Sequence, residues 1–238
     1  MRDALVVIPT YNERVGLEHI VGAVLDAGCR VLVVDDQSPD GTGDLADRIA
    51  SRSPQVTVLH RETKRGLGPA YADGFAVALE SNAPVICQMD ADFSHDPSDL
   101  SRLIERVRAG AGLVIGSRYV PGGSTPDWAA RRRLLSGAGN LYARIMLGSR
   151  IHDLTSGFRA WRPSTLSTVD PKTCQASGYA FQVEMAWRAE RAGHTVAEVP
   201  IVFRDRRVGA SKMSRAIIAE AMRLVTSWGI RRRLGQLP

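Results

Sequence analysis

Two aspartates, Asp90 and Asp92, lie two residues apart directly after a short apolar segment, residues 83–89. Two carboxylates held this close repel each other unless a cation lies between them. Mg²⁺ and Mn²⁺ take oxygen ligands and are commonly held by one or two carboxylates together with substrate phosphates. The pair therefore indicates an enzyme that acts on a nucleotide diphosphate. The alternative is a solvated acidic loop in which Asp96 caps a helix that begins at Pro97.

A second acidic segment, residues 33–42, ends another apolar segment. Its Asp35 and Asp36 could accept hydrogen bonds from a base or a ribose, and Asp40 begins an Asp-Gly-Thr turn that starts a helix. Alone, this is a common turn-and-cap pattern with a structural explanation. Together with the sequence PTYNE at residues 9–13, it favours a nucleotide-binding site.

The chain is basic, because 31 Lys and Arg residues face 25 Asp and Glu, a formal net charge of +6. The excess is concentrated in the second half, at residues 131–133, at 204–207 with Lys212, and at 231–233. A basic surface can bind nucleic acid, anionic lipid or a phosphorylated substrate. Nucleic-acid binding usually adds aromatic stacking residues or a known module. With 6% aromatic residues and no such module, we expect no nucleic-acid partner.

The elements that must position these residues follow from the apolar pattern. Short segments rich in Val and Ile predict strands that are covered on both faces, at residues 4–9, 30–35, 55–60, 84–89 and 113–116. Helical periodicity lies between them, at residues 16–27, 42–50, 68–79 and 97–109. This alternation predicts an α/β fold with a doubly wound, mainly parallel sheet flanked by helices. Ligands bind such sheets at the carboxyl ends of the strands, where the acidic segments fall.

The second half is less regular, with helices expected at 131–148, 179–193 and 214–229 and a strand at 195–203. Apolar residues recur at helical spacing in the last helix, at Ile217, Ala221, Leu224, Val225 and Trp228. An apolar face with a Trp and a basic end is typical of a helix at the surface of an anionic membrane. The helix at 131–148 has a similar composition. Helices that pack on the domain core show the same periodicity, so that alternative stays open.

The 238 residues, 44% of them hydrophobic, suffice for one large α/β domain. We find no internal repeat or linker, so residues 1–238 are expected to form a single domain. No apolar run approaches the roughly 18 residues that span a bilayer, and we expect no signal peptide. Three scattered cysteines, Cys29, Cys87 and Cys174, predict reduced thiols and a cytoplasmic location.

The motifs, taken in order, carry a family resemblance. VVIPTYNE, VVDDQSPDGT, RGLGPAYADGF, MDADFSHDP and GSRY resemble the inverting glycosyltransferases of family 2, which have the Rossmann-like GT-A fold. In the second half, GSRYVPGG, NLYARIMLG, DLTSGFRAWR, GYAFQVEMAWRA and EVPIVFRDRRVGASKMS resemble polyprenol-phosphate mannose synthases of the single-domain actinobacterial type. The resemblance covers residues 4–234.

The resemblance implies a reaction and a location. Mannose would move from GDP-mannose to a polyprenyl or dolichyl monophosphate, with Mg²⁺ or Mn²⁺, on a protein held peripherally at the inner face of the plasma membrane. Residues 1–116 would form a nucleotide-binding half and residues 117–213 an acceptor half, with a lid loop at 204–212. Residues 214–238 would form an amphipathic helix and a basic tail. An anionic membrane surface is the expected partner, and a separate membrane protein is left open.

The resemblance also assigns roles to residues. The implied metal ligands are Asp90, Asp92 and Ser94, where Ser94 replaces a longer amide found in part of the family and a water could take its place. The implied nucleotide-sugar site comprises Pro9, Tyr11, Glu13, Val34, Asp36, Asp40, Lys64, Asp90, Ala91, Asp92, Arg206 and Lys212. The implied lipid-phosphate site comprises Arg118, Arg132 and Ser136. The residues implied in catalysis are Asp92, Arg118, Arg206 and Lys212.

This reaction asks for cations rather than for a strong base. The second pKa of a phosphate monoester is about 6, so the nucleophile is largely a dianion at neutral pH. Arginine binds phosphate oxygens in pairs and would hold it. His95 could bind metal or orient a ligand, and Glu184 could approach the sugar.

Other functions stay open. A related enzyme could transfer glucose or an N-acetylhexosamine, and a non-catalytic relative could bind a nucleotide sugar or lipid and regulate a partner. A nucleotidyltransferase is disfavoured, because PTYNE stands where a glycine-rich loop would follow the first strand.

Overall fold

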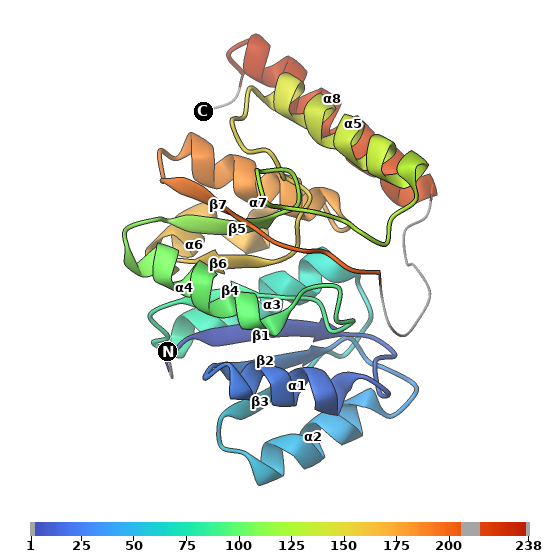
Figure 1. Ribbon diagram of the computed structural model, residues 1–238, viewed down its shortest axis with the longest axis vertical. Helices are drawn as coiled ribbons and strands as arrows, with labels where there is room; N and C mark the ends of the chain where they lie inside the picture. Colours follow the sequence, from blue (N-terminus) through green and yellow to red (C-terminus); the bar gives the residue numbers. More distant parts are fainter. Residues whose placement is uncertain (1–2, 206–214, 237–238) are drawn as a thin grey trace.

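The computed structural model describes residues 3–205 and 215–236, and its centre is one seven-stranded sheet (Figure 1). The strand order is β3-β2-β1-β4-β6-β5-β7. The strands are β1 Leu5–Thr10, β2 Arg30–Asp35, β3 Val56–His60, β4 Ile86–Gln88, β5 Leu113–Ser117, β6 Arg159–Trp161 and β7 Val196–Pro200. All neighbours pair in parallel except β6, which is antiparallel to both β4 and β5. The predicted doubly wound, mainly parallel sheet is confirmed.

Helices cover both faces of the sheet. They are α1 Leu17–Asp26, α2 Thr42–Arg52, α3 Leu67–Glu80, α4 Leu100–Arg108, α5 Ala130–Leu147, α6 Pro163–Val169, α7 Ala180–Arg191 and α8 Arg215–Arg233, with short 3₁₀ turns at Pro97–Asp99 and Pro171–Thr173. Strand β6, helix α6 and the second turn were not expected from the sequence. Three residues that include a buried arginine give β6 no alternating pattern to detect.

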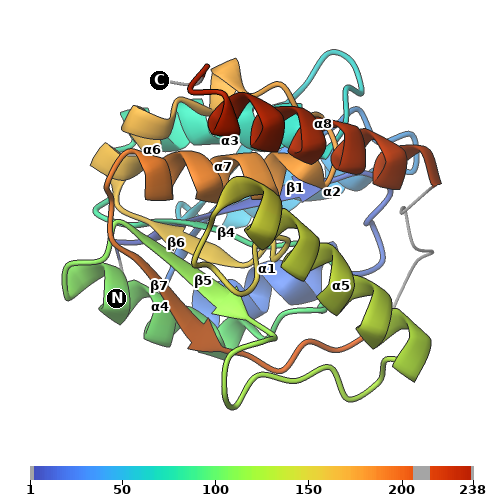
Figure 2. The same ribbon diagram turned by 90° about the horizontal axis from the view of Figure 1, so that it is seen from above.

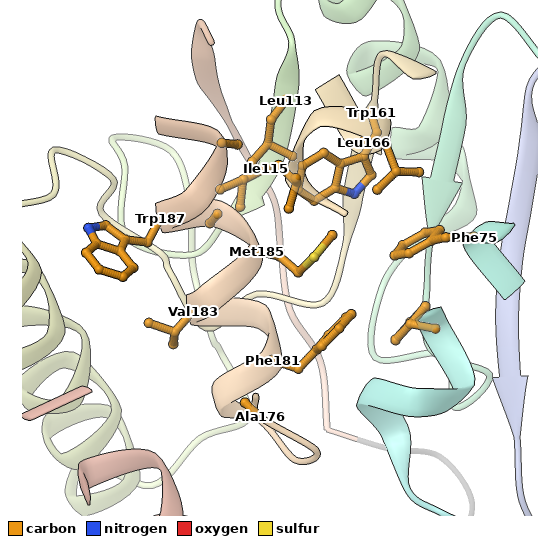
Figure 3. Packing of buried hydrophobic residues seen from close by; sticks show 14 of the residues in the cluster. Phe75, Leu113, Ile115, Trp161, Leu166, Ala176, Phe181, Val183, Met185 and Trp187 are labelled. Atoms are coloured by element: carbon orange, nitrogen blue, oxygen red, sulfur yellow. The ribbon is translucent and has the colours of Figure 1, made fainter. Parts of the chain in front are cut away.

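Successive strand side chains enter two different apolar clusters because they point to opposite faces of the sheet. Val6 and Ile8 of β1 pack with α1, α2 and α4. Leu5 and Val7 face the other way and join the cluster beneath α3, α6 and α7. Figure 3 shows part of this second cluster, in which Met185 and Phe181 of α7 point toward the side chains of the sheet and of α3. Two cores of this kind hold the carboxyl edge of the sheet rigid.

Helices α5 and α8 lie at one end of the molecule and touch each other over the C-terminal half of α5 (Figures 1 and 2). Tyr142 and Thr226 share a hydrogen bond of 2.7 Å between their hydroxyl groups. A Cβ atom at Gly229 would lie 2.8 Å from the backbone oxygen of Met146, so only glycine allows this approach. Figure 2 shows that the N-terminal end of α5 diverges from α8.

The face of α8 that the sequence suggested for a membrane packs instead on the protein. Val225 and Trp228 are buried, and the Trp228 ring stacks on Trp187 of α7 at 6.0 Å between centroids. Ala221 and Leu224 are partly buried against the same core. That interpretation of the face was therefore wrong, because periodicity does not say which surface an apolar stripe contacts.

A different part of these two helices is apolar and exposed. It comprises Leu134, Leu135, Leu141 and Ile145 of α5 with Ile218, Met222, Ile230 and Leu234 in and just after α8. None of the described helices is long and apolar enough to cross a bilayer. The sheet draws strands from residues 1–116 and 117–213 alike, and the division of the chain into functional segments stays a prediction.

Candidate active site

The strand register aligns polar residues at one edge of the sheet. Thr10 at the end of β1 pairs with Asp35 at the end of β2, and Asp35 pairs with His60 at the end of β3. On the other side of the sheet, Ser117 at the end of β5 pairs with Pro200 of β7. Since β4 is also parallel to β1, the loops that follow β1, β2, β3 and β4 leave the sheet at the same edge, as predicted, and the loop after β5 joins them.

Asp35 organises the loop after β2, and its predicted contact with a base or ribose stays a prediction. Its carboxylate accepts hydrogen bonds from the Thr10 hydroxyl at 3.0 Å and from the Ser38 hydroxyl at 2.6 Å and backbone N–H at 3.0 Å. These neutral donors fix the course of the loop. Pro9 and Val34, which are implied in nucleotide binding, are neighbours in the β1–β2 register beneath it.

Asp36 forms a buried ion pair with Arg61, which sequence reasoning did not single out. Nη1 of Arg61 donates to the Asp36 carboxylate, and Nε of Arg61 donates to Asp73 at 2.9 Å. The backbone N–H of Gly66 also donates to Asp36 at 3.3 Å. Arg61 thus ties the predicted nucleotide residue Asp36 to Asp73 in the middle of α3, and Gly66 ties it to the start of that helix. Its position within HRETKRGLG, just after β3, was the available signal.

Asp40 joins the loop after β1 to the start of α2. Its carboxylate accepts hydrogen bonds from the Thr42 backbone N–H at 3.0 Å and from the Arg14 backbone N–H at 3.3 Å. The Thr42 hydroxyl in turn accepts the Glu13 backbone N–H at 3.0 Å. Although desolvation alone would raise the pKa of Asp40, these hydrogen bonds lower it. The predicted residues Glu13 and Asp40 therefore belong to one rigid corner.

Lys64 and Tyr11 meet from two different loops. Nζ of Lys64 lies 3.4 Å from the centroid of the Tyr11 ring. This cation–π contact places a flat ring and a positive charge together at the carboxyl edge. The pairing suits a planar, phosphate-bearing ligand such as a nucleotide.

The acidic loop after β4 holds the two candidate metal ligands. Asp90 accepts a hydrogen bond of 3.2 Å from the Tyr71 hydroxyl. Burial, followed by the nearby Asp90 charge, raises the pKa of Tyr71 well above its ordinary value, so Tyr71 remains a donor. Asp92 accepts the Ser94 backbone N–H at 3.0 Å. Ala91 and Ser94 are buried within the same turn.

These residues fit Mg²⁺ or Mn²⁺. Two carboxylates with substrate phosphates are a common ligand set for such ions, and each carboxylate accepts a hydrogen bond from a neutral donor, the Tyr71 hydroxyl for Asp90 and the Ser94 backbone N–H for Asp92. A Cβ atom at Gly157 would lie 3.4 Å from Asp90 Oδ2, so glycine leaves space beside this carboxylate. Over residues 3–205 and 215–236, no three His, Cys, Asp or Glu side chains cluster as a metal site. Asp90 and Asp92 are thus the two candidate carboxylate ligands. The backbone N–H of Ser94 orients Asp92, and the predicted metal contact of the Ser94 hydroxyl stays a prediction.

His95 fills a stack of rings behind the acidic loop. Its imidazole lies 5.0 Å from the Phe158 ring and 5.2 Å from the Phe203 ring, edge-on to the latter. Burial lowers the pKa of His95 to about 4. The ring is therefore neutral near pH 7 and acts here as a packing link between the acidic loop and the segment after β7.

Arg118, at the end of β5, is held by a buried carboxylate. Its Nε and Nη2 donate to the two oxygens of Asp153 at 2.8 and 2.7 Å, and its backbone N–H donates to the same group at 2.9 Å. Burial would raise the pKa of Asp153, but the Arg118 charge and hydrogen bonds hold it below its ordinary value. Asp153 lies within DLTSGFRAWR, yet sequence reasoning gave it no role.

Hydrogen bonds connect Arg118 to Ser136 on α5. Arg118 Nη2 donates to the Thr155 hydroxyl at 2.7 Å, and Asn140 Nδ2 donates to the same oxygen at 3.1 Å. Asn140 also donates to the backbone oxygen of Ser136 at 3.2 Å, and the Tyr119 hydroxyl donates to the Ser136 side chain at 2.7 Å. The structure therefore brings together two of the three residues predicted for the lipid phosphate.

The third of these residues, Arg132, lies on the first turn of α5. It forms an exposed ion pair with Asp205 and lies 4.1 Å from the centroid of the Trp128 ring. A pocket of about 310 Å³ opens beside this region, lined by Arg118, Tyr119, Gly123, Ser124, Thr125, Pro126 and Arg133. Arg133 is thus a further cation of the site that was not singled out from the sequence.

Three of the predicted site residues remain, and one of them, Glu184, has a structural environment. Arg206 and Lys212, with most of the predicted lid loop, lie outside the described residues. Glu184 is buried, and its carboxylate accepts the backbone N–H groups of Gln175 and Ala176 and pairs with Arg188 at 2.6 Å. These contacts give Glu184 a structural role in α7.

Comparisons with known proteins place this chain in a family. Residues 5–169 match Glycosyl transferase family 2. A polyprenol monophosphomannose synthase of Mycolicibacterium smegmatis is 52% identical over 233 residues, which cover 97% of this chain and 88% of that relative. An undecaprenyl-phosphate mannosyltransferase of Micrococcus luteus is 51% identical over 228 residues, which cover 95% and 93%.

Solved structures share the fold. Glucosyl-3-phosphoglycerate synthase from Mycobacterium tuberculosis, in complex with Mn²⁺, UDP and glucosyl-3-phosphoglycerate, aligns with a TM-score of 0.67 at 20% identity and covers 100% of this chain and 81% of its own. A mannosyltransferase from Pyrobaculum calidifontis, in complex with GDP-Man and Mn²⁺, aligns with a TM-score of 0.63 at 17% identity and covers 99% and 65%. At these identities the likeness concerns the fold, and it confirms the expected GT-A architecture.

Proposed function

Because this chain belongs to glycosyl transferase family 2, we propose that it transfers mannose from GDP-mannose to a polyprenyl or dolichyl-type monophosphate. One observation carries the proposal. Over nearly its whole length, the chain is 52% and 51% identical in sequence to two relatives that are named for mannosyl transfer and polyprenyl lipids. The arrangement of charges in the site supports the same substrates.

Among the described residues, the acceptor side supplies arginines, and the reaction does not require a strong base. A phosphate monoester with a second pKa of about 6 is already a competent nucleophile at neutral pH. Arg118 and Arg132 would hold this dianion, with Ser136, which is linked to Arg118 through Asn140 and Thr155, beside them. The role of these side chains is to orient the phosphate and to offset its repulsion from the donor.

The donor side supplies carboxylates for a divalent ion. Asp90 and Asp92 would hold Mg²⁺ or Mn²⁺, which when bound would neutralise the charge that develops on the departing GDP. Tyr71 and the Ser94 N–H fix the two carboxylates. We propose that Arg206 and Lys212, which lie outside the described residues, add positive charge near the same phosphates.

The nucleotide would bind where the loops after β1, β2 and β3 meet. Tyr11 and Lys64 would contact the base or its phosphates through their paired ring and charge. Asp36, fixed by Arg61, would accept hydrogen bonds from the base or ribose. A guanine base is proposed from the family resemblance of the sequence motifs, because the acceptor groups of these loops do not distinguish one base from another.

An insoluble polyprenyl tail requires contact with a bilayer. The exposed apolar residues of α5 and α8 lie beside Arg131, Arg132 and Arg133 at one end and Arg231, Arg232 and Arg233 at the other. Apolar groups rimmed by arginine suit the inner face of an anionic membrane. We propose peripheral attachment through this face, with a separate membrane-protein partner left open.

Purified protein incubated with labelled sugar donors tests the activity. GDP-mannose, UDP-glucose and UDP-N-acetylglucosamine are each supplied with a polyprenyl phosphate and with Mg²⁺, Mn²⁺ or EDTA. We expect lipid-linked mannose from GDP-mannose and loss of product with EDTA. Label from a UDP-sugar alone would show a different donor, and no product from any donor would favour a binding or regulatory role.

Membrane attachment is tested by point substitution rather than by deletion of α8, because Val225 and Trp228 belong to the core. Leu134→Glu with Ile145→Glu should weaken sedimentation with anionic vesicles while a water-soluble short-chain acceptor is still used. Unchanged vesicle binding would exclude this face. The matched control is Val15→Glu, another highly exposed apolar residue, which lies in the loop before α1.

A further inference from the structure

Trp128 is buried, with 6% of its surface exposed, yet it belongs to neither of the two apolar clusters formed by the described residues. Its neighbours are residues of the site. Its ring lies 5.4 Å from the Phe203 ring, 5.4 Å from the Arg118 guanidinium and 4.1 Å from the Arg132 guanidinium. A tryptophan that only filled the core would pack among aliphatic side chains, so these contacts require another explanation.

One indole ring therefore contacts both arginines proposed for the acceptor phosphate. Two guanidinium groups repel each other, and each has its own carboxylate, Asp153 for Arg118 and Asp205 for Arg132. A further carboxylate between them would compete with an incoming phosphate. The negative face of an aromatic ring attracts both cations without carrying a charge, and it leaves the anion position to the substrate.

Among the described residues, the N–H of the same indole has no hydrogen-bond partner. Nε1 of Trp128 is buried and finds no hydrogen-bond acceptor within residues 3–205 and 215–236. A buried donor without an acceptor is unfavourable, and such groups in native proteins usually have a functional explanation. Here the donor lies beside two cations, so an anionic ligand would supply the acceptor.

The ring also connects the acceptor arginines to the donor loop. Phe203 contacts Trp128 on one side and His95 on the other, at 5.4 and 5.2 Å between ring centroids. The next residue, Arg204, donates its backbone N–H to the Ser94 oxygen at 3.1 Å. The position of Trp128 is thus fixed relative to the loop that carries Asp92.

We propose that Trp128 completes the acceptor-phosphate site: its ring holds Arg118 and Arg132 as a pair, and its indole N–H donates to an oxygen of the acceptor phosphate. This inference rests on the proposed transfer to a lipid phosphate and adds a residue to that site.

Two substitutions separate the ring from the N–H. Trp128→Phe keeps an aromatic ring and removes the donor, whereas Trp128→Leu removes both. The assay uses GDP-mannose, Mg²⁺ and a water-soluble short-chain polyprenyl phosphate, and it measures the acceptor KM and kcat. The Kd of GDP with Mg²⁺ is measured separately by calorimetry.

We expect Trp128→Phe to raise the acceptor KM about tenfold, which corresponds to one hydrogen bond to a charged group. Trp128→Leu should raise it further, and the GDP Kd should stay within about twofold in both variants. The control is Trp187→Phe. Trp187 is equally buried, contacts Arg191 at 5.0 Å and donates Nε1 to the Leu147 oxygen at 3.2 Å, but it lies outside the site. This control should lose stability without changing the acceptor KM.

The inference is overturned if both Trp128 variants keep the acceptor KM of the wild type, or if the GDP Kd rises by the same factor as the acceptor KM. If only Trp128→Phe keeps the acceptor KM of the wild type, the indole N–H does not contribute to acceptor binding. Should Trp128→Leu not fold, Trp128→Phe carries the test. The wild-type reaction run in parallel reports on the proposed function itself, because a wild type without product fails before any variant is compared.

Discussion

The donor and acceptor sides of the site fix opposite charges by opposite means. On the donor side, hydroxyl and backbone N–H groups orient Asp90, Asp92 and Asp40 in the hydrogen bonds described above. On the acceptor side, Arg118 and Arg132 are held by carboxylates and aromatic rings. In these hydrogen bonds neutral groups orient the three donor carboxylates, whereas each acceptor cation has a carboxylate of its own. Asp36, which pairs with Arg61, is the exception on the donor side.

The two acceptor arginines differ in turn from each other. The ion pair of Arg118 with Asp153 is buried, and its geometry is bidentate. The pair of Arg132 with Asp205 is about half exposed on both sides. A buried pair is costly to break, while an exposed pair contributes little. We therefore expect Arg118 to keep its carboxylate and Arg132 to exchange Asp205 for the phosphate.

Loss of a donor carboxylate should have the largest effect on the reaction. Asp92→Asn removes a metal ligand and its charge at the place where the leaving group becomes negative, so kcat should fall about a thousandfold. Initial rates at saturating GDP-mannose measure it. The matched control is Asp96→Asn in the same loop, whose carboxylate caps the turn at Ser98 with a bond of 2.9 Å. Substantial activity in Asp92→Asn would remove the metal from the mechanism.

The buried ion pair should dominate stability. Asp153→Asn leaves the Arg118 charge buried without a counter-charge and should lower the free energy of unfolding by about 3 kcal/mol or more. Urea denaturation measures this, with Asp99→Asn as the control because Asp99 and Arg102 form a partly exposed pair within one turn. Equal losses in the two variants would contradict the distinction between buried and exposed pairs.

The same pair predicts a pH dependence with a defined sign. The pKa of Asp153 is lowered in the folded state from the ordinary value of 3.8. Its contribution to stability is therefore fully present above about pH 4 and is lost as the pH falls through the lower folded pKa. The urea midpoint of the wild type should decrease when the pH is lowered below about 4. The part of this decrease that comes from Asp153 should be absent in Asp153→Asn.

A smaller effect is expected at the nucleotide end. Lys64→Met removes the cation from the Tyr11 ring and should raise the GDP Kd about threefold, the value of an exposed cation–π contact. The acceptor KM should not change. Arg65→Met is the control, since Arg65 is an exposed neighbour that pairs with Asp73 at 3.1 Å. A change in the acceptor KM would argue against two separate sides.

The smallest effect should be a gain. Asp205→Asn releases Arg132 from its exposed partner, so the acceptor KM should fall about twofold while the free energy of unfolding changes by less than about 1 kcal/mol. The fall should shrink at high salt, which screens the pair. A higher KM in this variant would show that Asp205 holds Arg132 in place for the phosphate rather than competing with it.

The sequence allowed the donor side to be anticipated better than the acceptor side. Asp36, Asp40, Asp90 and Asp92 follow strands whose apolar pattern is unambiguous, and their partners lie mostly within a few residues or at the next strand end. The parallel sheet then brings them together without further information. The same reasoning did not predict the order of the strands in the sheet, and it missed the antiparallel strand β6.

On the acceptor side, the decisive contacts join distant positions. Asp153 lies 35 residues from Arg118, and Asp205 lies 73 residues from Arg132. Trp128 gave no periodic signal, because the residues that bury it come from other elements. The buried face of α8 was misread for a related reason, since Trp228 and Val225 find their neighbours on α7 and α5 rather than in their own helix. The roles of single residues stay predictions until the variants are measured.

Strand β6 has one more consequence, for the distance between the two sides of the site. By standing between β4 and β5, it sets the strand ends that precede Asp90 and Arg118 two inter-strand spacings apart, roughly 9.6 Å. The chain enters β6 at this edge through Gly157, which places no side chain in the interval. The backbone hydrogen bonds of the sheet would then fix the distance between the strand ends that precede Asp90 and Arg118. Mutations in the loops would not easily change this distance.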